Sequence, residues 1–147
     1  MKIGMFCFTV LAMTSAAFAD SSLERDLGML DPAACAHVRG QIAASFEAVA
    51  QKKGLPLDAF TVGLVYPSCG VRNEPCVRSC WITIESKRAE LTSQYSLPVY
   101  GKDRMQTCEA QAAADLQQPD VGSAVVQRFG LFKRYCEVWT VKVDERL

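Results

Sequence analysis

The apolar positions of residues 31–54 follow a helical repeat. Asp31 is a good N-cap before Pro32, and Gly54 stands where the repeat ends, after two lysines. Side chains at intervals of three and four residues fall on one face of a helix. The sequence therefore predicts a helix from Pro32 to about Lys53 with one buried stripe. The members of this stripe are Cys35, Val38, Ile42, Phe46 and Val49.

Two later segments, residues 60–66 and 80–85, alternate between apolar and polar side chains. This two-residue repeat is typical of a β-strand, and the connection between the segments is rich in turn-forming residues. The pattern predicts a hairpin with a long tip. On its second strand, Cys80, Ile82 and Ile84 share a face.

A second helix is predicted over residues 102–118. Asp103 and Gln106 have the spacing of a capping box, and Pro119 closes the segment. The apolar stripe of this helix comprises Met105, Cys108, Ala112 and Leu116.

Three more segments fit strands: residues 89–96, 124–129 and 134–143. Residues 20–30 are polar with scattered leucines, which indicates a loose lead-in or a short helical turn. The whole order favours an α+β fold of two layers, in which two helices pack on one face of an antiparallel sheet of four to five strands.

Residues 1–19 have the layout of a secretory signal peptide: one lysine, an apolar run and the small-residue end Ala17-Phe18-Ala19. The short, Ala-rich form is typical of bacterial signals, so we expect the periplasm or the culture fluid. Residues 20–147 are then a single domain. Asp20-Ser21-Ser22, and no cysteine, stand directly after the cleavage site. No later segment has the roughly 20 apolar residues of a membrane span. We therefore expect no membrane anchor.

The charge of the chain argues against nucleic acid as a partner. Its 16 basic residues balance 16 acidic ones, whereas binding to nucleic acid relies on many neutralised phosphates. The sequence also contains no glycine-rich phosphate loop and no dinucleotide fingerprint. We expect no cofactor, and another protein is the expected partner.

The cysteines outside the signal are even in number, which in an exported chain predicts three disulfides. Two of them lie on the helical stripes, so we expect a bridge between the helices. The other two expected bridges close the hairpin tip and join two strands. If Cys80 and Cys136 faced each other in an antiparallel pair, apolar side chains of each strand would lie opposite arginines of the other. Either the two strands are therefore parallel, or the bridge leaves a strand for a loop, or this pairing is wrong. The expected pairs are Cys35–Cys108, Cys69–Cys76 and Cys80–Cys136.

A zinc site is disfavoured, because only Cys76 and Cys80 have a short ligand spacing and no second pair exists. His37 is the sole histidine, which excludes two-histidine hydrolysis. On its helix, a surface or packing role is favoured over that of a general base. Paired carboxylates remain an option for hydrolysis. The candidates are Glu47, Glu85, Glu90, Asp103 and Glu109.

Binding requires less of the sequence than catalysis does. Arg72, Asn73 and Glu74 form the tip of the disulfide-flanked loop, and Tyr95 and Tyr100 offer a second surface. The favoured function is an exported, non-enzymatic module that binds another protein, in the manner of an inhibitor or an immunity-type protein. Ordinary surface on a disulfide-stabilised domain explains the same residues. The alternative function is a small secreted hydrolase that uses a carboxylate pair or His37 with a carboxylate.

Overall fold

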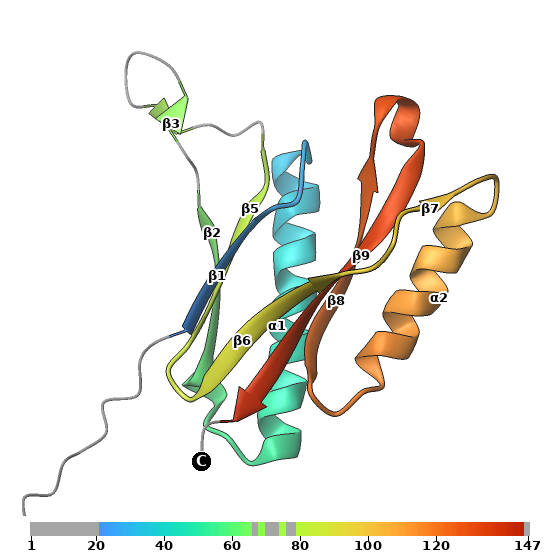
Figure 1. The fold of residues 1–147 in the computed structure, drawn as a ribbon. Coiled ribbons are helices and arrows are strands. Elements are labelled where there is room, and N and C mark those ends of the chain that lie inside the picture. Colours follow the sequence, from blue (N-terminus) through green and yellow to red (C-terminus); the bar gives the residue numbers. More distant parts are fainter. Residues whose placement is uncertain (1–20, 66–67, 70–73, 76–78, 146–147) are drawn as a thin grey trace, which may run out of the picture.

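The computed structural model describes residues 21–65, 68–69, 74–75 and 79–145 (Figure 1). The predicted signal peptide, residues 1–19, lies outside the described residues. Short 3-10 turns occupy Leu57–Ala59 and Leu131–Lys133. The helices and strands are, in chain order, β1 (Ser21–Asp26), α1 (Pro32–Lys53), β2 (Phe60–Val65), β3 (Ser68–Cys69), β4 (Glu74–Pro75), β5 (Trp81–Ser86), β6 (Ala89–Tyr95), β7 (Val99–Tyr100), α2 (Arg104–Leu116), β8 (Val121–Phe129) and β9 (Tyr135–Glu145).

Helix α1 has the two ends that the sequence predicts. The Asp31 carboxylate accepts a hydrogen bond from the Ala34 N–H at 2.8 Å, and Gly54 follows the last turn with a φ of 66°. Glycine adopts this left-handed φ at little cost because it has no Cβ. Four members of the predicted stripe are buried: Cys35, Ile42, Phe46 and Val49.

Helix α2 begins and ends slightly inside its predicted range. The predicted capping box at Asp103 is wrong, because its side chain makes no capping hydrogen bond. Asp103 has φ −97° and ψ 19°, whereas a capping carboxylate needs extended backbone at its own position. Instead, the Thr107 hydroxyl donates to the Asp103 carbonyl at 3.2 Å. Cys108 and Ala112 are buried as expected.

The first sheet has the antiparallel order β1-β5-β2. The pairing of β2 with β5 confirms the predicted hairpin, with Val62 opposite Ile84 and Leu64 opposite Ile82. Ile82 and Ile84 of β5, together with Cys80 directly before the strand, are buried, as the alternation predicts.

The prediction of a lead-in or helical turn for residues 20–30 is wrong for β1. This segment pairs antiparallel with β5, and Leu23 lies opposite Ile84. A short polar segment has little strand signal of its own, but the free edge of β5 offers it backbone hydrogen-bond partners. Tertiary pairing therefore decides its conformation.

In the second sheet, β9 is central, with β8 on one edge and β6 and β7 on the other. Trp139, Val141 and Val143 lie in the main core, whereas Cys136 and Val138 pack beneath α2. Both faces of β9 are thus covered, which explains its dense apolar composition. The short strands β3 and β4 pair with each other beyond the first sheet.

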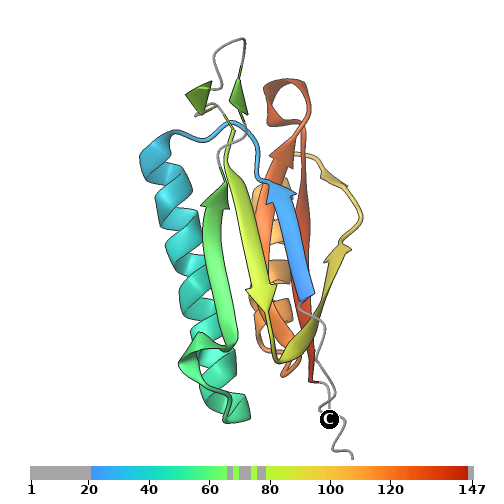
Figure 2. The ribbon, with the colours of Figure 1, turned by 90° about the vertical axis from the view of Figure 1, so that its left-hand side faces the viewer.

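The two sheets face one another, and α1 lies along the side between β2 and β8 (Figures 1 and 2). On the opposite side β1 lies beside β6. The main core fills the space between the sheets and α1. Helix α2 covers the outer face of β8 and β9. The largest fully buried side chains of the core are Trp139, Phe46, Ile42, Ile82 and Ile84.

The α+β class, the two helices and the antiparallel pairing are confirmed, but the packing differs from the prediction. The strands form two main sheets rather than one, and the helices do not share a face. This arrangement buries the apolar side chains that lie on both faces of β9 and on the inner face of β5.

Two disulfides lie in the described part of the chain, Cys35–Cys80 and Cys108–Cys136. The expected bridges Cys35–Cys108 and Cys80–Cys136 are therefore wrong. The helices lie on opposite sides of the second sheet, so their cysteines point to different strands rather than to each other. Cys35 of α1 is instead bonded to Cys80, just before β5 of the first sheet, and Cys108 of α2 is bonded to Cys136 on β9 of the second. The expected Cys69–Cys76 bridge lies outside the described residues.

Candidate functional site

The hairpin between β8 and β9 ends in a turn that presents two large apolar side chains to solvent. Leu131 is 75% exposed and Phe132 is 89% exposed. Phe132 and Lys133 have φ values of 58° and 54°. A residue with a Cβ pays on the order of 1–2 kcal/mol to adopt this left-handed conformation. The backbone is therefore strained at an almost fully exposed phenylalanine.

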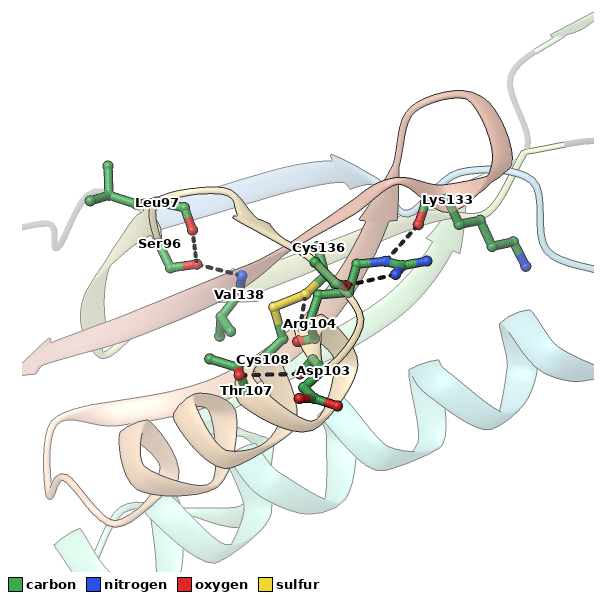
Figure 3. The surroundings of a disulfide bond; sticks show 10 residues. Ser96, Leu97, Asp103, Arg104, Thr107, Cys108, Lys133, Cys136 and Val138 are labelled. Carbon is green, nitrogen blue, oxygen red and sulfur yellow. Dashed lines mark hydrogen bonds between the residues drawn. A yellow bond between two sulfur atoms is a disulfide. The ribbon is translucent and has the colours of Figure 1, made fainter.

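Arg104 of α2 holds this turn in place (Figure 3). Its Nε donates to the Lys133 carbonyl at 3.0 Å, and its Nη1 donates to the Gly101 carbonyl at 2.8 Å. The Lys133 N–H in turn donates to the Gly130 carbonyl at 3.0 Å. Contacts that hold a strained turn this way reduce the entropy that binding would cost.

The Cys108–Cys136 disulfide supports the same turn from below. Cys136 is the second residue of β9, just after the turn, and Cys108 lies one turn beyond Arg104 on α2. The bridge therefore fixes the helix that supplies the Arg104 guanidinium to the strand that begins at the turn (Figure 3).

A row of aromatic rings crosses the sheet directly beneath the turn. Tyr100, Tyr135 and Phe129 are neighbours on β7, β9 and β8. The ring centroids of Tyr100 and Tyr135 are 5.2 Å apart, and those of Tyr135 and Phe129 are 5.5 Å apart. Tyr100 is 66% exposed. The sequence-predicted binding residue Tyr100 thus belongs to the same end of the fold as the turn.

An open cavity of about 620 Å³ adjoins the turn. Gly130 and Lys133 line it from the hairpin, and Met29 lines it from the β1–α1 connection. Met29 is 85% exposed. The charged residues of the lining are both cationic, Arg128 and Lys133. We call the exposed apolar set of this end, Met29, Tyr100, Leu131 and Phe132, the tip surface.

Tyr95 lies elsewhere and has a structural contact. The Arg25 guanidinium stacks over its ring at 4.5 Å and donates two hydrogen bonds to Gln127 Oε1, at 2.9 and 3.0 Å. Gln127 is buried, and its Nε2 donates to the Asp26 carbonyl at 3.1 Å. This network joins β1, β6 and β8, so Tyr95 is not part of the tip surface.

The remaining candidates from the sequence are not gathered at one place. Arg72 and Asn73 lie outside the described residues, as do the side chain of Glu74 and those of Cys69 and Cys76. His37 is exposed on α1. The carboxylate candidates are exposed and spread over several elements: Glu47 on α1, Glu85 on β5, Glu90 on β6, Glu109 on α2, and Asp103 before α2.

Glu85 has one acidic neighbour around a second cavity. It lines a polar space of about 320 Å³ together with Asp58, Lys87 and several hydroxyl groups. Among the residues described, no three His, Cys, Asp or Glu side chains are placed to hold a metal ion together. In that same part of the chain, no helix is long and apolar enough to cross a bilayer.

The turn at residues 130–133 was not predicted as a binding surface, although its sequence carries a signal. A hairpin turn usually carries polar residues, glycine or proline. Leu131 and Phe132 stand between Gly130 and two cations, Lys133 and Arg134. Apolar residues in such a setting point to an interaction surface.

Comparisons with protein-family models, with curated proteins and with solved structures found no match. The class of this protein is thus described by its fold and its tip surface. It is an α+β fold with two facing sheets and disulfides that presents an apolar hairpin turn.

Proposed function

We propose that the protein is an exported, non-enzymatic module that binds another protein through the tip surface. The observation that carries this proposal is the turn at Leu131 and Phe132, where two large apolar side chains are exposed on strained, well-supported backbone. Full burial of such side chains stabilises a complex by about 1.5–3 kcal/mol each. Exposed aromatic residues held in one conformation are the common anchors of protein interfaces.

The shape of the surroundings favours a protein over a lipid surface. The cavity beside Met29 and Lys133 is concave and holds about 620 Å³, so it suits an inserted side chain better than a flat bilayer. The chain as a whole is close to neutral, which gives little general attraction to anionic lipid. Arg128 and Lys133 at the cavity favour a partner with acidic groups near its apolar anchor.

Export to the periplasm or the culture fluid belongs to this proposal. It is supported by the signal-like residues 1–19 and by two disulfides in the described part of the chain, since disulfides persist in oxidising compartments. An inhibitor or immunity-type role fits such a module. The loop tip Arg72-Asn73-Glu74 remains a predicted second contact. Figure 1 places β3, which leads into that loop, at the same end of the molecule as the β8–β9 turn.

Capture from periplasmic and culture-fluid extracts of the source organism tests the proposal. The immobilised protein is compared with Phe132→Asn and with a matched control, Leu97→Asn, because Leu97 is 85% exposed and lies outside the tip surface. We expect one protein that is retained by the wild type and the control but lost with Phe132→Asn. The purified partner must then bind directly, with a Kd at least about tenfold weaker for Phe132→Asn.

Three results would contradict the proposal. They are the absence of any partner that depends on Phe132, equal loss of capture with Leu97→Asn, and Phe132-dependent binding to phosphatidylglycerol vesicles in place of a protein.

A second candidate function is supported by the cavity that Asp58 and Glu85 line, because two carboxylates beside one polar space are the minimum for glycoside hydrolysis. Turnover of cell-wall and ester substrates by the wild type, lost with Asp58→Asn and with Glu85→Gln, would establish this hydrolase. Turnover that is lost with His37→Gln but kept in the two carboxylate variants would instead establish a hydrolase that uses His37.

A further inference from the structure

Strand β8 leaves one edge of the second sheet open. It pairs with β9 on one side, and among the residues described no strand pairs with its other side. An edge strand directs unpaired N–H and C=O groups outward, where an added strand can bond to them. Near the start of β8 the Ser45 hydroxyl of α1 donates to the Gly122 carbonyl at 2.6 Å. Helix α1 thus bonds directly to this edge at Gly122.

Beyond Gly122 a groove of about 550 Å³ opens along the edge. Val38 and Ile42 of α1 form one wall, and Leu116 of α2 reaches it from the other side. Leu116 is 38% exposed, although it belongs to the apolar stripe of its helix. The groove shares Val38 with the cavity beside the tip surface. The two spaces thus adjoin along β8, and together they are called the path.

Ser123 lines the groove and is only 1% exposed. Its hydroxyl has no hydrogen-bond partner within the described part of the protein. A buried hydroxyl without a partner has lost the hydrogen bonds that water would give it, which destabilises the free protein. A ligand that supplies a backbone N–H or C=O group in the groove would recover this loss.

We infer that the groove binds an extended segment of the partner protein as an additional strand on β8. This inference rests on the proposed function, because the segment belongs to the protein that the tip surface anchors. Residues 123–128 of β8 run for about 20 Å, which accommodates roughly six residues of an added strand. The backbone of the segment bonds to the open edge, as in other complexes formed by strand addition.

The lining of the groove specifies the chemistry of this segment. Val125 packs with the main core, whereas Ala124 and Val126 pack with the cluster beneath α2. An added strand therefore meets apolar side chains on both of its faces, so it carries consecutive apolar residues rather than an alternating pattern. Arg128 and Lys133 line the far end of the path, and an acidic residue of the segment belongs there.

A second copy of this chain fits the groove poorly. Helices α1 and α2 stand on either side of the open edge and would meet the same helices of another β8 before the two edges came together. A single flexible segment enters such a groove without this obstruction.

A phage library of random 12-residue peptides, selected on the full disulfide-bonded protein, tests the inference. We expect enriched peptides to share a run of consecutive apolar residues beside Asp or Glu. Ala44→Arg fills the groove from an exposed position of α1 and should weaken binding of these peptides at least about tenfold. Ala36→Arg, at an exposed α1 position outside the groove lining, is the matched control and should change the Kd less than about twofold.

Two further readouts separate strand addition from other binding. Ser123→Ala should weaken peptide binding about threefold to tenfold without lowering Tm, because the hydroxyl has no partner in the protein itself. Peptide binding should also slow hydrogen exchange of amides within residues 123–128. The inference would be overturned if Ala44→Arg left the Kd of the peptides unchanged, or if bound peptide did not protect these amides from exchange. A library without enrichment, or self-association that protects the same amides, would also overturn it.

Failure of strand addition and failure of the tip surface as an anchor give different results. Leu97→Asn should leave peptide binding unchanged, since Leu97 is exposed and lies outside both the groove lining and the tip surface. Capture of a partner that depends on Phe132 but not on Ala44 would uphold the tip surface and refute strand addition. Peptide binding that depends on Ala44, without any partner that depends on Phe132, would uphold strand addition and refute the tip surface.

Discussion

Because the turn is strained at Phe132, we expect Phe132→Asn to stabilise the protein. Phe132 is already 89% exposed, so Phe132→Asn loses only roughly 0.3 kcal/mol of burial. Its φ of 58° costs a residue with a bulky side chain about 1 kcal/mol or more, whereas asparagine tolerates this region. The free energy of unfolding should therefore rise by about 0.5–1 kcal/mol. The corresponding gain in Tm is about 2–4 °C for a domain of this size.

Urea unfolding and thermal unfolding of the oxidised protein, followed by circular dichroism, measure this change. Leu131→Asn is the matched control: Leu131 is 75% exposed but has no positive φ, so its replacement should bring no gain. A loss of about 1 kcal/mol or more with Phe132→Asn, or an equal gain with Leu131→Asn, would refute the assignment of strain to Phe132. A gain in stability together with the loss of partner capture would show that the turn trades stability for binding.

Other predictions concern the packing that supports this end of the fold. Gly122→Ala places a Cβ in steric overlap with the ring of Phe46, so it should cost about 1–3 kcal/mol. Phe46→Leu in the same chain should recover part of that cost; strict additivity in a double-mutant cycle would contradict the overlap. Replacing Cys108 and Cys136 by alanine opens a loop with a sequence separation of 28 and should cost about 3.5 kcal/mol; an unchanged urea midpoint would argue against the bridge. Asp31→Ala should cost about 1 kcal/mol through the lost helix cap, whereas Asp31→Asn should cost little.

Local patterns were sufficient where a segment carries its own signal. Asp31, the apolar stripe and Gly54 each specify part of α1, and all three were found in their expected roles. The alternation of Cys80, Ile82 and Ile84 likewise identified the buried face of β5. These features depend on backbone conformation and on a repeat of a few residues, both of which are written in the nearby sequence.

Pairing between distant segments was not accessible in this way. The helical stripes correctly placed Cys35 and Cys108 on buried faces, but they did not say that the two faces point to opposite sides of the second sheet. The expected bridge between these residues failed for that reason. Strand β1 was missed because its strand conformation depends on the edge of β5 rather than on its own composition.

The sequence alone determined the class of the fold, the ends of α1, the main hairpin and the expectation of disulfides. Only the tertiary structure brought Met29 to the β8–β9 turn, and it also left Ser123 in an open groove beside an unpaired strand edge. The physical reason is that a repeat reports which face of an element is apolar, whereas the partner of that face depends on how all the faces are buried together. The candidate binding surfaces arise at the places where this burial is incomplete.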